Sequence, residues 1–284
     1  MKRRPVAPHF YSGDCARQIE TFLRRFRPPA EPAVPLAGIV PHAGWAYSGA
    51  VAAKVIKCLQ PASPDAFVIF GAVHSWGVRE GAVYPSGSWL TALGEAEIDE
   101  ELAGLLLDKC PRHLTADPDS HAQEHSIEVQ VPMIQYLHPT AKIVPISMPP
   151  TDHAAQAGKA VGAAIAGSGR RVAVLGSSDL THYGQNYGFA PWGFGPAARE
   201  KMAANDRSVI DLALAFDADK IVGEAQEHSN ACGAGAIAAA VTAAKAMGAE
   251  KSALVEYTTS HEVMHEPPED FRMAVGYAGL LFGK

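Results

Sequence analysis

Short apolar runs alternate along the chain with longer stretches in which apolar residues recur at helical spacing. The short runs are typical of buried strands, and the longer stretches predict helices. The predicted strands cover residues 36–40, 66–71, 142–148, 171–176, 252–258 and 273–282. The predicted helices cover residues 48–59, 98–107, 124–137, 152–166, 196–216 and 234–247. This alternation predicts an α/β fold with a mostly parallel central sheet flanked by helices on both faces.

Length and composition are those of an ordinary globular protein with a sizeable core. The chain has 284 residues, 48% of them hydrophobic, and no Gly/Ser/Pro linker or charge run divides it near the middle. We therefore expect one domain over residues 1–284. The net charge of −6 argues against a nucleic-acid partner, because such a partner requires clustered Lys and Arg. The basic residues near the N-terminus are interpreted as a solvated segment: Arg3, Arg4, Arg24, Arg25 and Arg27.

The sequence predicts neither a signal peptide nor a transmembrane segment. The charged start 1–4 resembles a signal peptide, but the residues that follow supply no apolar region. The Ala-rich stretch 231–249 is too short and too weakly apolar to span a bilayer. The four cysteines lack CxxC spacing, which predicts reduced thiols. We expect a cytoplasmic protein without membrane contact.

Three histidines each follow a predicted strand: His42, His74 and His182. Ligands of open α/β sheets bind beyond the carboxyl ends of the strands, so these imidazoles could converge on one metal ion or substrate. Taken singly, each fits an ordinary hydrogen-bonded turn residue. Three such histidines together are hard to explain as core filling, because buried strand ends favour aliphatic side chains.

Two further positions carry possible chemistry. Cys232 directly precedes the Ala-rich helix, where exposed N–H groups would favour a thiolate, although an inert buried thiol is the simpler interpretation. His121 and His125 have the i,i+4 spacing of one helical face, as have His125 and Glu128 at i,i+3. A zinc-binding helix is one interpretation and an ordinary capped helix is the other.

Five ordered motifs resemble the Memo family, the "mediator of cell motility" group whose prokaryotic members are also called AmmeMemoRadiSam system protein B. The motifs are 41–49 (PHAGWAYSG), 124–129 (EHSIEV), 177–184 (SSDLTHYG), 232–233 (CG) and 275–278 (VGYA). The chain departs from the usual family pattern at Ala72-Val73, before His74, and at Trp45, where Tyr is more common. The resemblance spans nearly the whole chain and implies the architecture of class III extradiol dioxygenases, which use non-haem Fe(II).

The resemblance also implies roles for individual residues. His42, His74 and Cys232 would be the metal ligands, His182 would be the acid/base histidine, and His125 and Asp179 would line or brace the pocket. The thiol stands where the dioxygenases have a carboxylate. A thiolate preserves the charge of the ligand set but is softer, so Fe(II) is the expected metal and Cu or Zn are alternatives.

Three functions remain open from the sequence. The first is a metal-dependent oxidoreductase acting on a small, planar or aromatic molecule, with the loop 183–195 as a wall of its pocket or as an inward-packed surface turn. The second is a non-catalytic metal- or peptide-binding scaffold, and the third is a zinc-dependent hydrolase. A homodimer is compatible with the chain, although no pattern marks an interface.

Overall fold

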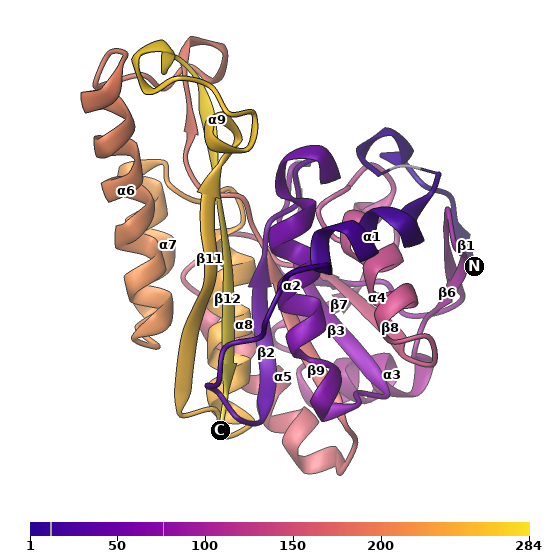
Figure 1. Ribbon diagram of the computed structural model, residues 1–284. Helices are drawn as coiled ribbons and strands as arrows, with labels where there is room; N and C mark the ends of the chain where they lie inside the picture. The colour runs from indigo at the N-terminus through magenta and orange to yellow at the C-terminus, as the bar shows by residue number, and fades with distance from the viewer. Residues whose placement is uncertain (12, 76) are drawn as a thin grey trace.

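A large mixed sheet organises the protein (Figure 1). The computed structural model describes residues 1–11, 13–75 and 77–284. The strands lie in the spatial order β10 (His182–Tyr183), β12 (Ala274–Gly283), β2 (Pro35–Val40), β9 (Val172–Ser177), β3 (Ala66–Gly71), β8 (Lys142–Ser147), β4 (Gly81–Val83) and β7 (Leu114–Ala116), and β11 (Lys251–Thr259) pairs with β12. A separate small sheet contains β1 (Lys2–Arg3), β5 (Ser88–Thr91) and β6 (Gly94–Glu97).

The centre of the large sheet is parallel. Strands β2, β9, β3 and β8 run in one direction, whereas β12 is antiparallel to β2 and β4 is antiparallel to β8. Every residue of β3 and β9 is buried, which explains why these strands are continuous apolar runs rather than alternating ones. The predicted fold class is confirmed, with antiparallel strands added on both sides of the parallel centre.

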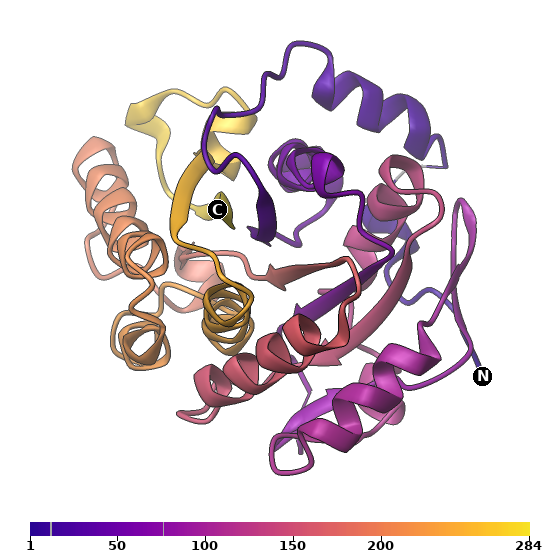
Figure 2. The same cartoon turned by 90° about the horizontal axis from the view of Figure 1, so that it is seen from below.

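Helices cover both faces of the sheet (Figure 2). One face carries α1 (Cys15–Leu23), α2 (Ala50–Cys58) and α4 (Val131–Leu137), and the other carries α3 (Glu100–Lys109), α5 (Ala154–Ser168) and α8 (Ala234–Ala246). Helices α6 (Pro196–Leu214) and α7 (Ala218–His228) pack beside α8, and the short helix α9 (Ser260–Val263) follows β11. Within the described ranges, no helix combines the length and the apolarity needed to cross a bilayer.

Helices α5 and α8 approach each other unusually closely. A Cβ atom placed on Gly158 would overlap the backbone of Ala239, and one placed on Gly162 would overlap the backbone of Ala243. Small residues on both helices therefore allow backbone to pack against backbone. This contact holds α8, and with it the loop that precedes α8, against the sheet.

Some predicted helices start later than the sequence pattern indicates. The predicted helix 124–137 becomes regular only at Val131, after 3-10 turns at Asp119–His121 and Glu128–Gln130. The side chain of Glu124 accepts a hydrogen bond from the N–H of Ser126, and such a local bond competes with helix formation. The Ala-rich helix, by contrast, begins at Ala234 as predicted, two residues after Cys232.

The start of the chain is tied to the body of the protein by a buried ion pair. The Arg3 guanidinium lies 2.8 Å from a carboxylate oxygen of Glu128, and both side chains are almost fully buried. The same carboxylate accepts the backbone N–H of Ala7 and the hydroxyl of Tyr11. The interpretation of Arg3 as part of a solvated segment is therefore wrong, because this pair and its hydrogen bonds compensate for the burial of its charge.

Candidate metal centre

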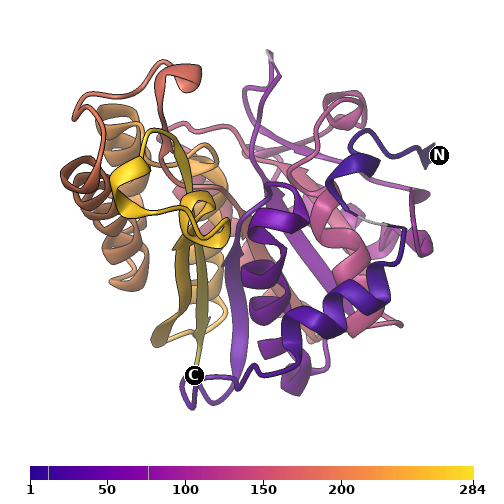
Figure 3. The same cartoon turned by 45° about the horizontal axis from the view of Figure 1, so that its top comes forward.

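The carboxyl ends of three central parallel strands meet at one edge of the sheet, which Figure 3 brings forward. His42 follows β2, His74 follows β3, and Asp179 and His182 follow β9. Neighbouring parallel strands end at the same edge, so residues far apart in the sequence are brought together there. The expected convergence of strand-end residues is thus present in the fold.

Three imidazoles form a compact group at this edge. One ring nitrogen from each of His42, His74 and His125 lies within 4.8 Å of the other two. The rings of His74 and His125 are stacked with centroids 4.9 Å apart, and the ring of His42 stands nearly perpendicular to both. His42 is buried, His125 is partly exposed and His74 is exposed.

The orientation of His42 is set by a chain of hydrogen bonds. The hydroxyl of Ser177 donates its proton to the carbonyl of Ser126, 2.8 Å away. The same hydroxyl therefore accepts from Nδ1 of His42, 3.0 Å away, which leaves the lone pair of Nε2 to face the Cys232 sulfur, 3.3 Å away, or to bind a metal ion. Burial lowers the pKa of His42, and the neighbouring His74 lowers it further. The ring is thus held neutral, with Nε2 as its available donor atom.

His74 is oriented by a carboxylate. Its Nδ1 lies 3.0 Å and 3.1 Å from the two carboxylate oxygens of Glu124, which also accepts the backbone N–H of His74. The hydrogen bond to Glu124 raises the pKa of His74 despite partial burial. Burial alone would raise the pKa of Glu124, but the bonds from His74 hold it below its usual range. A carboxylate-supported histidine of this kind is common at metal sites.

His125 completes the group from a different loop. Its ring contacts the edge of Phe10 as well as the rings of His42 and His74. Burial lowers the pKa of His125, and the nearby His74 lowers it further. The resemblance implied a lining role for this residue, and the geometry adds it to the histidine triplet.

The donor set fits a transition metal. In His42 and His74 the Nδ1 atom is engaged by an oxygen partner, so Nε2 is the atom available as a ligand. Imidazole nitrogens suit Zn, Cu and Fe, and three of them leave coordination positions for water or substrate. Three histidines could therefore hold one metal ion here.

Cys232 lies beside this group but not within it. Its sulfur is 3.3 Å from Nε2 of His42 and 3.6 Å from the backbone oxygen of Asp179. Burial raises the pKa of the Cys232 thiol, and the charge of Asp179 raises it further. The expectation that a helix start favours a thiolate is therefore not met without a bound cation. The helix begins two residues later, and desolvation outweighs its dipole.

Asp179 braces the two loops that carry the site. One of its oxygens accepts the backbone N–H groups of His42, at 2.7 Å, and of Ala43, at 3.2 Å. Burial raises the pKa of Asp179, although these hydrogen bonds act in the opposite direction. The residue thus fixes the backbone of the loop after β2, in agreement with the bracing role that the resemblance implied.

His182 faces the same cavity from the start of β10. Its Nδ1 lies 3.0 Å from the carbonyl oxygen of Leu180, so Nδ1 carries the proton and Nε2 can accept one in the neutral ring. The edge of its ring contacts Tyr187. The preceding residue, Thr181, donates its N–H to the buried carboxylate of Asp206. Asp206 was not foreseen from the sequence.

A cavity of about 650 Å³ lies over the histidine triplet. Its lining includes all six residues to which the resemblance gave a role except Cys232, together with aromatic and apolar side chains to which the sequence gave none: Phe10, Tyr47, Met273, Val275 and Tyr277. Of the loop 183–195, Tyr187 lines the cavity, whereas Tyr183, Phe189 and Trp192 pack into a cluster of their own. Both expectations for that loop are therefore partly met.

Comparison with known proteins identifies the family. Residues 3–281 match the family model described as Memo-like protein. The chain is 37% identical to a MEMO1 family protein of Thermococcus onnurineus, with 100% of each chain covered. The chain belongs to the Memo-like family. Other Memo-like relatives are MEMO1 family proteins of Archaeoglobus fulgidus, 36% identical, and of Pyrococcus horikoshii, 34% identical, with 99% of each chain covered in both cases.

The fold of this Memo-like protein also resembles a solved structure. An uncharacterized protein of Escherichia coli K12 superposes with a TM-score of 0.50 at 15% sequence identity, over 85% of this chain and 99% of that chain. At this identity the likeness concerns the fold alone. Function must therefore be argued from the cavity and its residues.

Proposed function

We propose that this Memo-like protein is a metal-dependent oxidoreductase that acts on a small planar or aromatic molecule. The observation that supports the proposal best is the convergence of His42, His74 and His125 beneath a cavity with aromatic walls. Iron is the proposed metal, because imidazole-rich sites with open positions suit oxygen-dependent chemistry. The buried thiols of Cys58 and Cys110, outside any disulfide, suit a reducing compartment such as the cytoplasm.

The proposed ligand set is His42, His74 and a third group. His125 is favoured as the third ligand because its ring nitrogen lies within the triplet. Cys232 is the alternative, since its sulfur faces Nε2 of His42 at 3.3 Å. A bound cation would favour the thiolate that burial otherwise disfavours.

The protein's own residues have separable tasks in this proposal. The metal, when bound, would supply Lewis acidity and a site for redox chemistry. His182 would take a proton from a substrate hydroxyl at Nε2, because its Nδ1 is engaged by Leu180. Tyr47, Met273 and Tyr277 would exclude water and contact the flat faces of the substrate.

A zinc-dependent hydrolase is the second candidate, favoured by the all-histidine character of the triplet. The metal content of protein purified under nitrogen, without added metal, separates the candidates. About one iron or copper per chain supports the oxidoreductase, and about one zinc supports the hydrolase. Protein that stays metal-free after incubation with each ion contradicts both and favours a non-catalytic scaffold. Oxygen consumption with a panel of catechols then tests the oxidoreductase proposal. If none of the catechols causes oxygen consumption, the result argues against it.

Matched substitutions identify the third ligand. We expect His42→Ala and His74→Ala to abolish stoichiometric metal binding. If His125 is the third ligand, His125→Ala lowers metal affinity far more than Cys232→Ser, and the reverse order assigns the thiol. His228→Ala, on the exposed end of α7, is the control and should bind metal like the unaltered protein. Full metal retention in His42→Ala would contradict the site itself.

A further inference from the structure

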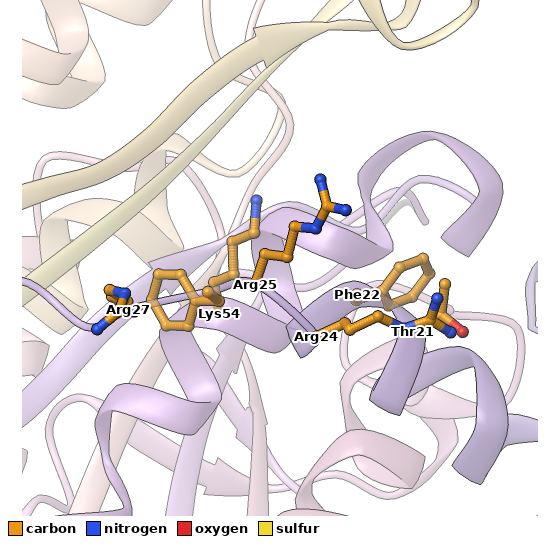
Figure 4. A pocket seen from close by; sticks show the side chains of 7 residues that line it. Thr21, Phe22, Arg24, Arg25, Arg27 and Lys54 are labelled. Carbon is orange, nitrogen blue, oxygen red and sulfur yellow. The ribbon is translucent and has the colours of Figure 1, made fainter.

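A basic pocket lies where the segment after α1 meets the middle of α2, outside the histidine cavity (Figure 4). We call it the Arg pocket. Its volume is about 430 Å³, and it is lined by Thr21, Phe22, Arg24, Arg25, Phe26, Arg27 and Lys54. None of these residues lines the cavity over the histidine triplet. The basic residues come from two elements, the segment directly after α1 and the middle of α2.

The positive charge of the Arg pocket is not neutralised by the protein. Lys54 pairs with Glu256. Among the ion pairs of the described residues, none involves Arg24, Arg25 or Arg27, and all three are exposed. The nearest acid on α1, Glu20, accepts a hydrogen bond from Tyr136. These three arginines therefore line the pocket without an ion-pair partner among the described residues.

Stabilisation of α1 does not account for this cluster. Only Arg24, the C-cap residue of α1, lies where the helix dipole favours a cation, whereas Arg25 and Arg27 follow after the helix has ended. The helix is instead fixed by packing, because the ring of Phe22 contacts Trp45 and fills the space over Gly49. Neighbouring like charges repel one another, and a bound anion would offset this repulsion.

We propose that the Arg pocket binds a small molecule that carries two or more phosphate groups. Guanidinium groups bind phosphate oxygens through pairs of parallel hydrogen bonds, and three of them match a ligand with several such oxygens. Figure 4 shows Arg25 and Lys54 extending in the same direction, but the ammonium group of Lys54 is paired with Glu256, so the free charges for a ligand are those of the arginines. The partly exposed ring of Phe22 offers an apolar contact for the rest of the molecule.

The size of the pocket favours a small ligand over a nucleic acid. A volume of about 430 Å³ lies within the range of small-molecule sites. Nucleic acids require an extended basic surface, whereas this chain carries a net charge of −6. The inference does not depend on the proposed oxidoreductase function, because the two sites share no lining residue.

Calorimetric titration with pyrophosphate tests the proposal. The unaltered protein should bind it at low salt, and binding should weaken as salt rises. The double variant Arg25→Ala/Arg27→Ala should bind at least about tenfold more weakly, because it removes two charge-assisted contacts. The matched control is Arg79→Ala/Arg112→Ala, which removes two arginines that line a different cavity. This control should bind pyrophosphate like the unaltered protein.

Each other outcome overturns the proposal. No heat of binding in the unaltered protein would show that the pocket takes no such ligand. If both double variants bound pyrophosphate equally weakly, the binding would reflect general charge attraction. If only the control variant bound it more weakly, the binding site would lie outside the Arg pocket. Tighter binding of a single-stranded oligonucleotide than of pyrophosphate would favour nucleic acid. All four arginines are exposed, so unchanged melting temperatures should confirm that the variants fold.

Discussion

The orientation of each histidine in the triplet depends on a residue distant in the sequence. Strand-end positions predicted His42, His74 and His182, because short apolar runs mark where buried strands stop. The partners Ser177 and Glu124 were not predictable, since their contacts with these rings form only when the strands are assembled. The sequence therefore predicted histidines that the fold brings to one cavity, but not which nitrogen of each ring faces that cavity.

The substitution Glu124→Gln tests whether the Glu124 carboxylate supports His74 as a metal ligand. The amide keeps the shape of the side chain but removes the negative charge that holds His74. Metal affinity should fall by about 10- to 100-fold, as is usual when the carboxylate behind a ligand histidine is lost. Competition with a chelator measures the change. Glu20→Gln, on the exposed face of α1, is the control. Equal affinity in the two variants would mean that Glu124 has no role in metal binding.

Asp206 should make stability depend on pH. Burial raises the pKa of this carboxyl to about 6, although Thr181 and Tyr257 donate hydrogen bonds to it. Between about pH 4 and pH 6 the unfolded chain loses this proton and the folded protein keeps it. The free energy of unfolding should therefore fall as pH rises through this window, by roughly 3 kcal/mol from this residue. Above about pH 7, where the carboxyl is ionised in both states, its contribution should be constant.

Urea unfolding of Asp206→Asn between pH 4 and pH 7 checks this expectation. The amide cannot ionise, so the stability difference between the variant and the unaltered protein should shift in favour of the variant as pH rises. Asp211→Asn, on the exposed side of the same helix, should show no such shift. If the free energy of unfolding of Asp206→Asn differed from that of the unaltered protein by the same amount at every pH, the pKa of Asp206 would not be raised in the folded protein.

At the scale of elements, the pattern predicted the long strands of the large sheet and most helices within a few residues, but it missed the short strands β1, β4, β5, β6, β7 and β10. The parallel strands were clear because both of their faces are buried, which produces unbroken apolar runs. The antiparallel pairing of β12 between β2 and β11 was not predictable, because pairing partners leave no local signal. The late start of α4 was missed because side chains upstream of it, such as Glu124, bond to local backbone instead.

The contact between α5 and α8 allows a matched test within one helix. A methyl group at Gly158 would overlap the carbonyl oxygen and Cα of Ala239, which cannot move independently of the helix. Gly158→Ala should therefore lower the free energy of unfolding by at least about 2 kcal/mol. Gly167, in the same helix, is exposed with no atom near its Cβ position.

Gly167→Ala should accordingly raise stability by about 0.5–1 kcal/mol, since alanine favours helix without a clash. Chemical denaturation of both variants gives the comparison. The two Gly→Ala substitutions in α5 should therefore change the free energy of unfolding in opposite directions. Stabilisation by Gly158→Ala would show that the two backbones are not in close contact.

At the scale of the whole molecule, the N-terminal segment belongs to the site. Glu128 holds it through Arg3, the N–H of Ala7 and the hydroxyl of Tyr11, which places Phe10 against His125. Arg3→Met should lower the free energy of unfolding by about 3–5 kcal/mol, because it leaves a buried carboxylate without its partner. Thermal and urea unfolding measure this loss.

The double variant Arg3→Met/Glu128→Gln should recover part of that loss, because the second change removes the uncompensated charge. Arg4→Met, at an exposed neighbouring position, is the control and should leave stability within about 0.5 kcal/mol. If the double variant were less stable than Arg3→Met, the buried charge would not be the source of the loss.

The place of β12 in the sheet has a consequence for how a newly made chain matures. This strand lies next to β2, yet more than two hundred residues of sequence separate them. During translation, one edge of β2 stays unpaired until β12 has been synthesised, because β12 lies near the end of the chain. Contacts of such high sequence separation form late. Val275 and Tyr277 at the start of β12 also wall the histidine cavity. A nascent chain would thus carry His42 and His74 well before the pocket around them could close.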